Sequence, residues 1–313
     1  MYTTNGARTR RALAALAASA LAATVAAGCG VPAGSSPGGR LDVVAAFYPL
    51  QFVTEQVGGD RVAVRNLVPP GTEPHDLELS PRQVAELGSA DQVVYLKGFQ
   101  PALDDAVADQ AADKALDVAA VQPLATGYVP IEAGELHQDE KGTDPHVWLD
   151  PIRLAAIADT VAARLAALDQ PHAARYTANA TALRTRLTSL DAQFAKALAD
   201  CAQRTIVVSH NAFGYLAARY RLTQVPITGL TPEEEPSPAR LAEVARYAKD
   251  HHVRVIFFET LVSPKVARTL ADEVGATAKV LDPIEGLAEG STGDYFSAMR
   301  ANLATLRDAL RCR

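Results

Sequence analysis

Short apolar segments alternate with longer helical segments through most of this 313-residue chain. The apolar segments have the length and side chains of buried strands, and Gly, Pro or polar residues separate them from the helical ones. The predicted strands are 41–47, 62–68, 92–96, 205–209, 253–258 and 278–281. The predicted helices are 49–57, one that begins at Ser80-Pro81, 151–168, 212–219, 240–250, 264–274 and 295–310. Repeated strand–helix units predict an α/β fold with mainly parallel sheets covered by helices.

One segment interrupts this alternation. Residues 172–202 run for about thirty residues without glycine or proline, much longer than the average helix of about 11–12 residues. Apolar side chains recur there every three or four positions, at Tyr176, Leu183, Leu187, Leu190, Phe194 and Leu198. This spacing predicts one long amphipathic helix. We interpret it as a connector between an N-terminal lobe, 41–171, and a C-terminal lobe, 203–313; a long surface helix of a single domain is the alternative.

The first 28 residues have the composition of an export signal. Arg8, Arg10 and Arg11 precede an uncharged run rich in Ala and Leu over residues 12–27, and about 20 residues would be needed to span a membrane. The run ends at Ala26-Ala27-Gly28-Cys29, which resembles the lipobox of bacterial lipoproteins, although Ala26 stands where Leu is usual. We expect Cys29 to be lipidated after removal of residues 1–28. A plain secretory signal with an incidental cysteine is the alternative.

Residues 29–40 are rich in Gly, Ser and Pro and predict a flexible linker behind that anchor. The expected mature protein is therefore extracytoplasmic and anchored to the cell membrane. The adjacent Arg10-Arg11 leaves twin-arginine export open beside the general secretory route. A formal net charge of −6, without a basic stripe interleaved with aromatics, argues against a nucleic-acid partner.

Metal-binding types of side chain stand at the ends of predicted strands. In open α/β sheets, ligands bind at the carboxyl ends of the strands. Two such residues come from each predicted lobe: His75, His146, His210 and Asp282. Three imidazoles with one carboxylate suit tetrahedral Zn(II), and nitrogen-rich ligation favours Zn, Cu or Ni over Mg, Ca or Mn. Each residue alone also fits an ordinary polar surface position, and Asp282 before Pro283 also fits the start of a turn.

The segments around these residues resemble a known family. They read PGTEPHDLELSP, DPHVWLDP, SHNAFGYLA and LDPIEG. They are similar to the metal-binding solute-binding lipoproteins of bacterial ABC importers, the TroA/ZnuA-like zinc and manganese receptors, from about residue 41 to the C-terminus. The resemblance implies the cluster A-I periplasmic-binding fold: two lobes bridged by a rigid helix, with one metal in the cleft. It also implies His75, His146, His210 and Asp282 as metal ligands and an ABC permease as partner.

The third ligand position separates zinc from manganese members of this family. Zinc-type members have His there and manganese-type members typically have Glu, so His210 implies Zn(II) as the transported ligand. One departure is residues 132–144, where many zinc-type members have a His-rich loop. This chain has five carboxylates and only His137 in that segment. We interpret it as a solvated loop, with weak metal gathering as the alternative.

Two further cysteines, Cys201 and Cys312, remain once Cys29 is assigned to the anchor. A disulfide is permitted outside the cytoplasm, so we predict that they pair and pin the last helix near the linking helix. A thiolate metal ligand is the alternative.

The sequence therefore predicts a monomeric zinc-binding receptor and no enzyme, because four protein ligands leave no open position for an activated water. We expect the carboxylate Asp282 to be the ligand that weakens during transfer to the permease. The alternatives are a manganese or iron receptor of the same family, an adhesin, and a secreted zinc hydrolase. The chain contains no HExxH motif to support the hydrolase.

Overall fold

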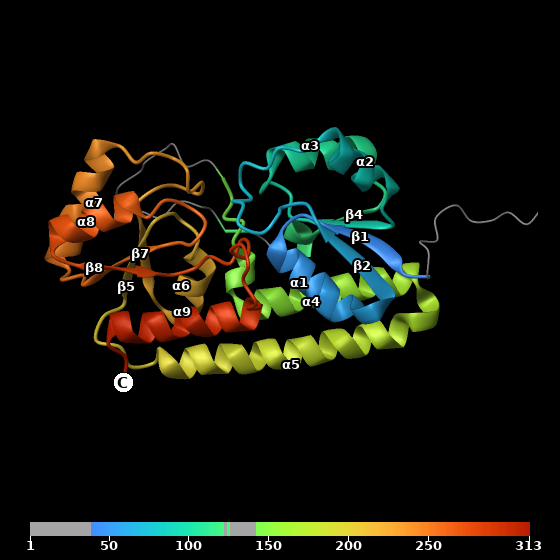
Figure 1. Cartoon of the computed structure of the whole chain (residues 1–313). Helices are drawn as coiled ribbons and strands as arrows, with labels where there is room; N and C mark the ends of the chain where they lie inside the picture. The colour runs from blue at the N-terminus through green and yellow to red at the C-terminus, as the bar shows by residue number, and fades with distance from the viewer. Residues whose placement is uncertain (1–38, 122–123, 126–141) are drawn as a thin grey trace, which may run out of the picture. The chain divides into compact units, whose positions relative to one another are not determined.

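The structure is a computed structural model and describes residues 39–121, 124–125 and 142–313 (Figure 1). The described residues contain two four-stranded parallel sheets with the orders β2-β1-β3-β4 and β6-β5-β7-β8. The first sheet consists of β1 (Leu41–Ala45), β2 (Val62–Asn66), β3 (Gln92–Tyr95) and β4 (Ala115–Asp117). The second consists of β5 (Thr205–Val208), β6 (Thr223–Pro226), β7 (Val255–Phe258) and β8 (Thr277–Val280). The predicted pair of parallel α/β lobes is confirmed, and each lobe repeats the same strand order.

Helices follow the strands as the alternation predicts. Those of the N-terminal lobe are α1 (Tyr48–Gly58), α2 (Pro81–Ser89), α3 (Pro101–Gln110) and α4 (Pro151–Leu168). Those of the C-terminal lobe are α6 (Gly214–Tyr220), α7 (Pro238–Asp250), α8 (Lys265–Val274) and α9 (Tyr295–Leu310). The polar residue before a helix often fixes where it begins: Ser80 forms a capping box with Gln83, and the Asp150 carboxylate accepts from the Ile152 amide.

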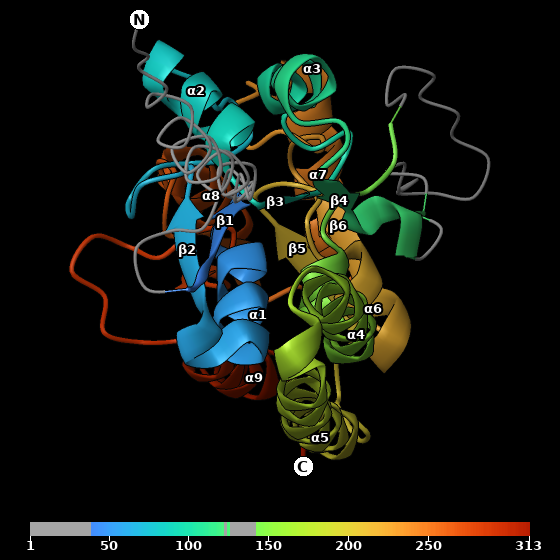
Figure 2. The ribbon, with the colours of Figure 1, turned by 90° about the vertical axis from the view of Figure 1, so that its right-hand side faces the viewer.

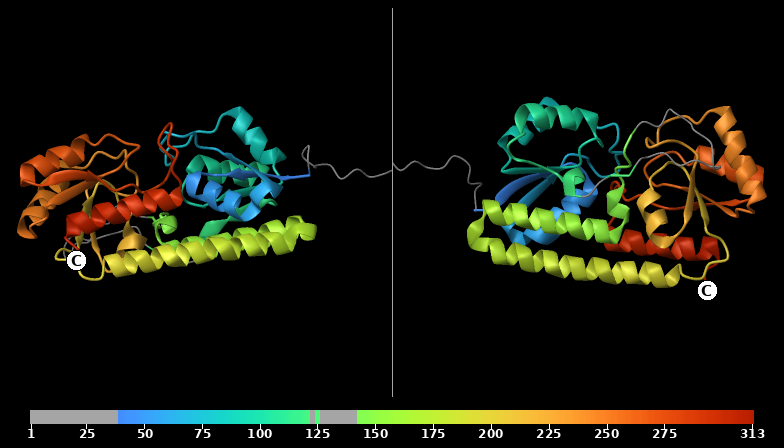
Figure 3. Two further views of the ribbon diagram at one scale, coloured as in Figure 1. Left: turned by 60° about the horizontal axis from the view of Figure 1, so that its bottom comes forward. Right: turned by 180° about the vertical axis from the view of Figure 1, so that it is seen from behind.

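The long helix α5 (Ala173–Ala197) contacts α1 and α4 of the first lobe and α9 of the second. Figure 2 looks along α4 and α5, and Figure 3 shows α5 running beneath both α4 and α9. Its apolar stripe is buried against these helices, as the spacing predicts. α5 ends at Ala197, short of the predicted residue 202. There the Arg204 guanidinium donates a hydrogen bond to the carbonyl oxygen of Leu198, the residue that closes the helix.

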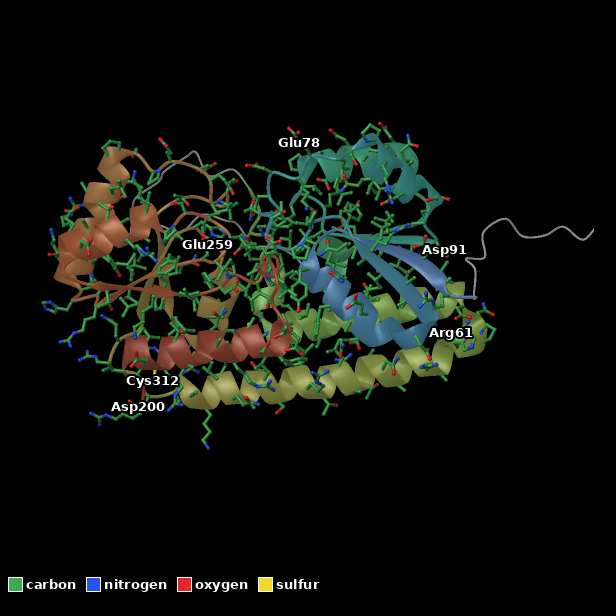
Figure 4. The ribbon with its side chains drawn as sticks, in the orientation of Figure 1. Arg61, Glu78, Asp91, Asp200, Glu259 and Cys312 are labelled. Carbon is green, nitrogen blue, oxygen red and sulfur yellow. A yellow bond between two sulfur atoms is a disulfide. The ribbon has the colours of Figure 1, made fainter. Side chains whose placement is uncertain are left out.

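The chain behind α5 meets the chain behind α9. The sulfur atoms of Cys201 and Cys312 are 2.00 Å apart, and the two residues also form an isolated antiparallel bridge. The Arg313 amide donates to the carbonyl oxygen of Asp200 next to them; Cys312 and Asp200 are labelled in Figure 4. The C-terminus is therefore fastened to the end of the linking helix.

Several predicted features fall on residues 1–38 and 126–141, outside the described residues. They are the signal segment, Cys29, most of the linker 29–40, and His137 with most of the loop 132–144. Within the described ranges, every helix is either too short or too polar to cross a lipid bilayer.

Candidate metal site

Four buried side chains meet with their donor atoms within 4.8 Å of one another: His75, His146, His210 and Glu285. The Glu285 Oε1 atom is 3.3 Å from His75 Nε2, 3.1 Å from His146 Nε2 and 3.2 Å from His210 Nε2. The Nε2 atoms of His146 and His210 are 3.3 Å apart. Three imidazole nitrogens and one carboxylate oxygen therefore face a common centre.

The topology brings these donors together from both lobes. His75 lies in the loop between β2 and α2, and His146 directly precedes the short 3₁₀ helix Val147–Leu149 that leads into α4. His210 lies two residues after β5, and Glu285 lies in the loop after β8. Three of the four therefore follow the carboxyl ends of parallel strands, where ligands bind in such sheets.

The structure does not bring Asp282 into this cluster, and Glu285 takes the place that we expected for Asp282. The Asp282 carboxylate instead accepts a hydrogen bond of 2.7 Å from the Ile284 amide, so it starts a turn, which was the alternative for an Asp before Pro. Asn302 of α9 holds its backbone through the amide and the carbonyl oxygen. The turn carries the chain round so that Glu285, three residues later, reaches the imidazoles.

The loop that carries Glu285 is held by the N-terminal lobe. The Trp148 indole donates a hydrogen bond of 2.7 Å to the Pro283 carbonyl oxygen, and the Gly71 amide donates one of 2.7 Å to that of Leu287. Between these two contacts Ile284 is buried and has φ of 58°, a left-handed conformation that is rare for a β-branched residue. Such strained backbone persists where its surroundings fix it, and here it aims Glu285 at the histidines.

Two of the histidines are oriented by carboxylates behind them. The Nδ1 atom of His146 is 2.8 Å from Asp144 Oδ1, and that of His210 is 2.9 Å from Glu259 Oε1. With Nδ1–H donating to a carboxylate, each imidazole presents the lone pair of Nε2 to the centre of the cluster. Glu259 also accepts from the Ser209 hydroxyl, and Figure 4 labels it in the C-terminal lobe.

Three carboxylates at the site were not predicted from the sequence: Asp144, Glu259 and Glu285. A signal existed for Glu259, because it directly follows β7 at the carboxyl end of a buried strand. Asp144 stands two residues before His146 in the DPH segment, and its carboxylate accepts from both the backbone amide and the ring of that histidine.

The electrostatics of the cluster favour a cation at its centre. Burial opposes protonation of His146, but hydrogen bonds to Asp144 and Glu285 outweigh it and raise its pKa. Burial likewise opposes protonation of His210, but the charges of Glu259 and Glu285 hold its pKa well above the usual value. Burial raises the pKa of Glu285, but the charge of His210 outweighs it and holds that pKa well below its usual value. Positive charge among these groups is therefore stabilised.

Aromatic rings pack behind the histidines. The ring centroid of Phe99 is 4.6 Å from that of His75, and the ring centroid of Trp148 is 5.2 Å from that of His146. Phe47 lies against both Phe99 and Trp148. These rings keep water away from the back of the cluster and limit the rotation of the imidazoles, so the donors are held in place.

Two parallel α/β lobes, a long helix along both, and a buried cluster of three histidines and one glutamate define a metal-binding solute-binding protein. Residues 43–309 match the family described as ZnuA, zinc-uptake complex component A, periplasmic. The chain therefore belongs to this family, and the resemblance drawn from the four motifs is confirmed.

Curated relatives carry zinc in their names. The zinc-binding protein AdcA of Streptococcus pyogenes serotype M6 is 35% identical over 291 residues, covering 86% of this chain and 56% of that protein. The high-affinity zinc uptake system protein ZnuA of Bacillus subtilis strain 168 is 34% identical over 289 residues, covering 88% of this chain and 89% of that protein. The chain thus spans about half the length of the AdcA proteins that it matches.

Solved structures of zinc-binding and laminin-binding proteins have the same fold as this chain. Zn(II)-bound AdcA from Streptococcus pneumoniae superposes with a TM-score of 0.74 at 34% identity, covering 87% of this chain and 58% of that one. The laminin-binding adhesin Lmb from Streptococcus agalactiae, in a mutant structure, has a TM-score of 0.77 at 31% identity, covering 86% of this chain and 99% of that one. The fold of this chain is therefore that of these binding proteins.

Proposed function

We propose that this protein is an extracytoplasmic Zn(II) receptor that binds the ion between its lobes and delivers it to an ABC permease. The ligands are His75, His146, His210 and Glu285. The observation that carries the proposal is the convergence of three Nε2 atoms on one Glu285 oxygen, from elements of both lobes. Membership of the zinc-uptake family supports the same ion.

The donor set supports zinc over manganese or iron. Three imidazoles and one carboxylate match the four-coordinate geometry that Zn(II) prefers, and nitrogen donors favour Zn(II) over Mn(II) and Fe(II). Four protein donors leave no open position for an activated water, so we propose that the protein binds and releases its metal without catalysing a reaction. A secreted zinc hydrolase stays the alternative among enzymes, and an adhesin the alternative among binding proteins.

The mature form follows from the N-terminal segments. We propose that residues 1–28 are removed, that Cys29 is lipidated, and that the linker 29–40 tethers a monomeric receptor to the membrane. The receptor then comprises an N-terminal lobe, 41–171, a linking helix, 172–202, and a C-terminal lobe, 203–313. Outside the cytoplasm Cys201 and Cys312 form a disulfide. Mass spectrometry of the mature protein, which reports the acylated terminus and the free thiols, tests these steps.

Metal content and competition test the function. Protein purified without added metal is expected to contain about one zinc per chain, and zinc is expected to displace manganese at matched free-metal concentrations, as the Irving–Williams order requires. His146→Ala is expected to weaken zinc binding by orders of magnitude while the circular dichroism spectrum is kept. His251→Ala, an exposed histidine at the end of α7, is the matched control and is expected to bind as the wild type does. Tighter binding of manganese than zinc would refute the zinc assignment.

A further inference from the structure

The four donors of the metal site differ in exposure, and this difference shows on which side the site meets solvent. His75 is 8% exposed, whereas His146, His210 and Glu285 are each 1% exposed or less. A metal ion that enters or leaves without unfolding the cluster therefore passes along the edge formed by His75.

Glu73 lies on that same edge. Its Oε2 atom accepts a hydrogen bond of 2.9 Å from the His75 amide, which fixes the carboxylate beside the imidazole. Its Oε1 atom is 3.9 Å from His75 Nε2, the atom that faces the centre of the cluster. Glu73 is nevertheless not among the four residues whose donor atoms lie within 4.8 Å of one another. It borders the site beside His75 and does not complete the set of donors.

The free oxygen of this carboxylate has no structural use among the described residues. The Glu73 side chain is 10% exposed, and Oε1 is buried without a hydrogen-bond partner in the described part of the chain. A buried acceptor without a partner destabilises the fold, and more so when it is charged. Capping the turn at His75 uses Oε2 alone, so a purely structural role leaves the cost at Oε1 unexplained.

The surroundings of Glu73 favour a passing cation. The carboxylate of Glu285, in the centre of the cluster, and that of the exposed Glu233, in the C-terminal lobe, both act electrostatically on Glu73. Exposure of these acidic side chains therefore falls from Glu233 at the surface, through Glu73 at the edge of the site, to Glu285 in its centre.

We propose that Glu73 is a transit ligand: its carboxylate binds Zn(II) at the His75 edge and passes the ion to His75 and Glu285, and takes it back on release. This inference rests on the proposed zinc-receptor function. Exchange of one ligand at a time keeps the ion coordinated along the way, whereas loss of several bonds at once exposes a bare cation to a buried, low-dielectric site. Glu73 therefore acts on the rates of exchange, and the bound state is held by the other four residues.

Stopped-flow measurement of zinc binding tests this role, with the single tryptophan, Trp148, as the fluorescent reporter beside His146. Glu73→Gln keeps the acceptor for the His75 amide and removes the charge. We expect the association and dissociation rate constants to fall together by about tenfold, with Kd within about threefold of the wild type, where 1.4 kcal/mol corresponds to a factor of ten. Glu73→Asp keeps a carboxylate and is expected to give rates between the two. Glu78→Gln, an exposed glutamate in the same loop labelled in Figure 4, is the control with unchanged rates.

The results that overturn the proposal are distinct. Unchanged rates in Glu73→Gln mean that the carboxylate only caps the turn. A Kd raised a hundredfold through faster dissociation alone means a permanent ligand. If Glu73→Gln does not fold, as judged by circular dichroism, Glu73→Asp decides: rates equal to the wild type or a large rise in Kd refute the transit role. A wild-type protein that does not bind zinc refutes the proposed function itself, which separates the two failures.

Discussion

The carboxylate of the metal site offers the sharpest single test, because two candidates lie three residues apart. Glu285 Oε1 lies within 3.3 Å of three imidazole nitrogens, whereas Asp282 accepts from the Ile284 amide and lies outside the cluster. Glu285→Gln and Asp282→Asn each remove one negative charge and keep the shape of the side chain. The pair therefore separates a ligand from a neighbouring charge.

The positions of the two carboxylates determine how much each substitution should change zinc affinity. Outer-shell partners of metal ligands are typically worth about 10–100-fold in affinity, and a charged donor in direct contact is worth more. We expect Glu285→Gln to weaken zinc binding by at least about 100-fold, or about 2.8 kcal/mol at 1.4 kcal/mol per tenfold. Asp282→Asn keeps an oxygen acceptor for the Ile284 amide. We expect it to change Kd by no more than about threefold, or about 0.7 kcal/mol.

Competition titration with a chromophoric zinc chelator, at one buffered pH, measures both values. Thermal unfolding of the zinc-free variants checks that each is folded. The assignment fails if Asp282→Asn weakens zinc binding as much as Glu285→Gln does, or if Glu285→Gln binds as the wild type does. In the first case the loop rearranges when metal binds, and the resting geometry does not report the ligand.

Three further predictions follow from the outer shell, the cysteines and the titrating histidines. Glu259→Gln and Asp144→Asn should each weaken zinc binding about 10–100-fold in the same titration. Replacement of Cys201 and Cys312 by serine removes a cross-link between residues 111 positions apart, which the chain-entropy estimate values at about 4–5 kcal/mol of unfolding free energy. Unfolding in urea should show this loss of stability, and the zinc affinity should be unchanged. The raised pKa of His210 stabilises the zinc-free protein fully below about pH 6.5, and this stability is lost as the pH rises through the folded-state pKa. Because zinc displaces that proton, the rise in Tm caused by zinc should grow from about pH 6 to about pH 8, and a shift independent of pH would contradict this.

The main elements of the fold could be predicted because their signals are local. Each long apolar run became a strand, and the Gly-free and Pro-free segment in mid-chain became α5. The misses are α3, β4 and β6. β4 is only three residues, Ala115–Asp117, and β6, Thr223–Pro226, contains one Val and ends in Pro. Such short strands form because a neighbouring strand offers hydrogen bonds, and that information is not in their own residues.

The structure brings the three predicted histidines together, but the carboxylate beside them is Glu285 and not Asp282. Parallel strands bring their carboxyl ends to one edge of a sheet, so His210, two residues after β5, and His75, in the loop after β2, lie at that edge. The choice between Asp282 and Glu285 depends instead on the turn between them. In that turn the backbone of Ile284 is in the left-handed region, which β-branched residues rarely adopt, so the sequence does not predict it. It is imposed by tertiary contacts such as the hydrogen bond from Trp148 to Pro283.

The same contacts bear on how the ion leaves. Glu285 is the single anionic donor of the cluster, and its loop is bound to the N-terminal lobe through the Pro283 and Leu287 carbonyl oxygens. Separation of the lobes along this loop breaks both hydrogen bonds and withdraws the carboxylate, which leaves a divalent cation among neutral imidazoles. The expectation that the carboxylate is the ligand that weakens during transfer therefore passes from Asp282 to Glu285. If the proposed permease pulls the lobes apart, we expect withdrawal of this loop to release the ion.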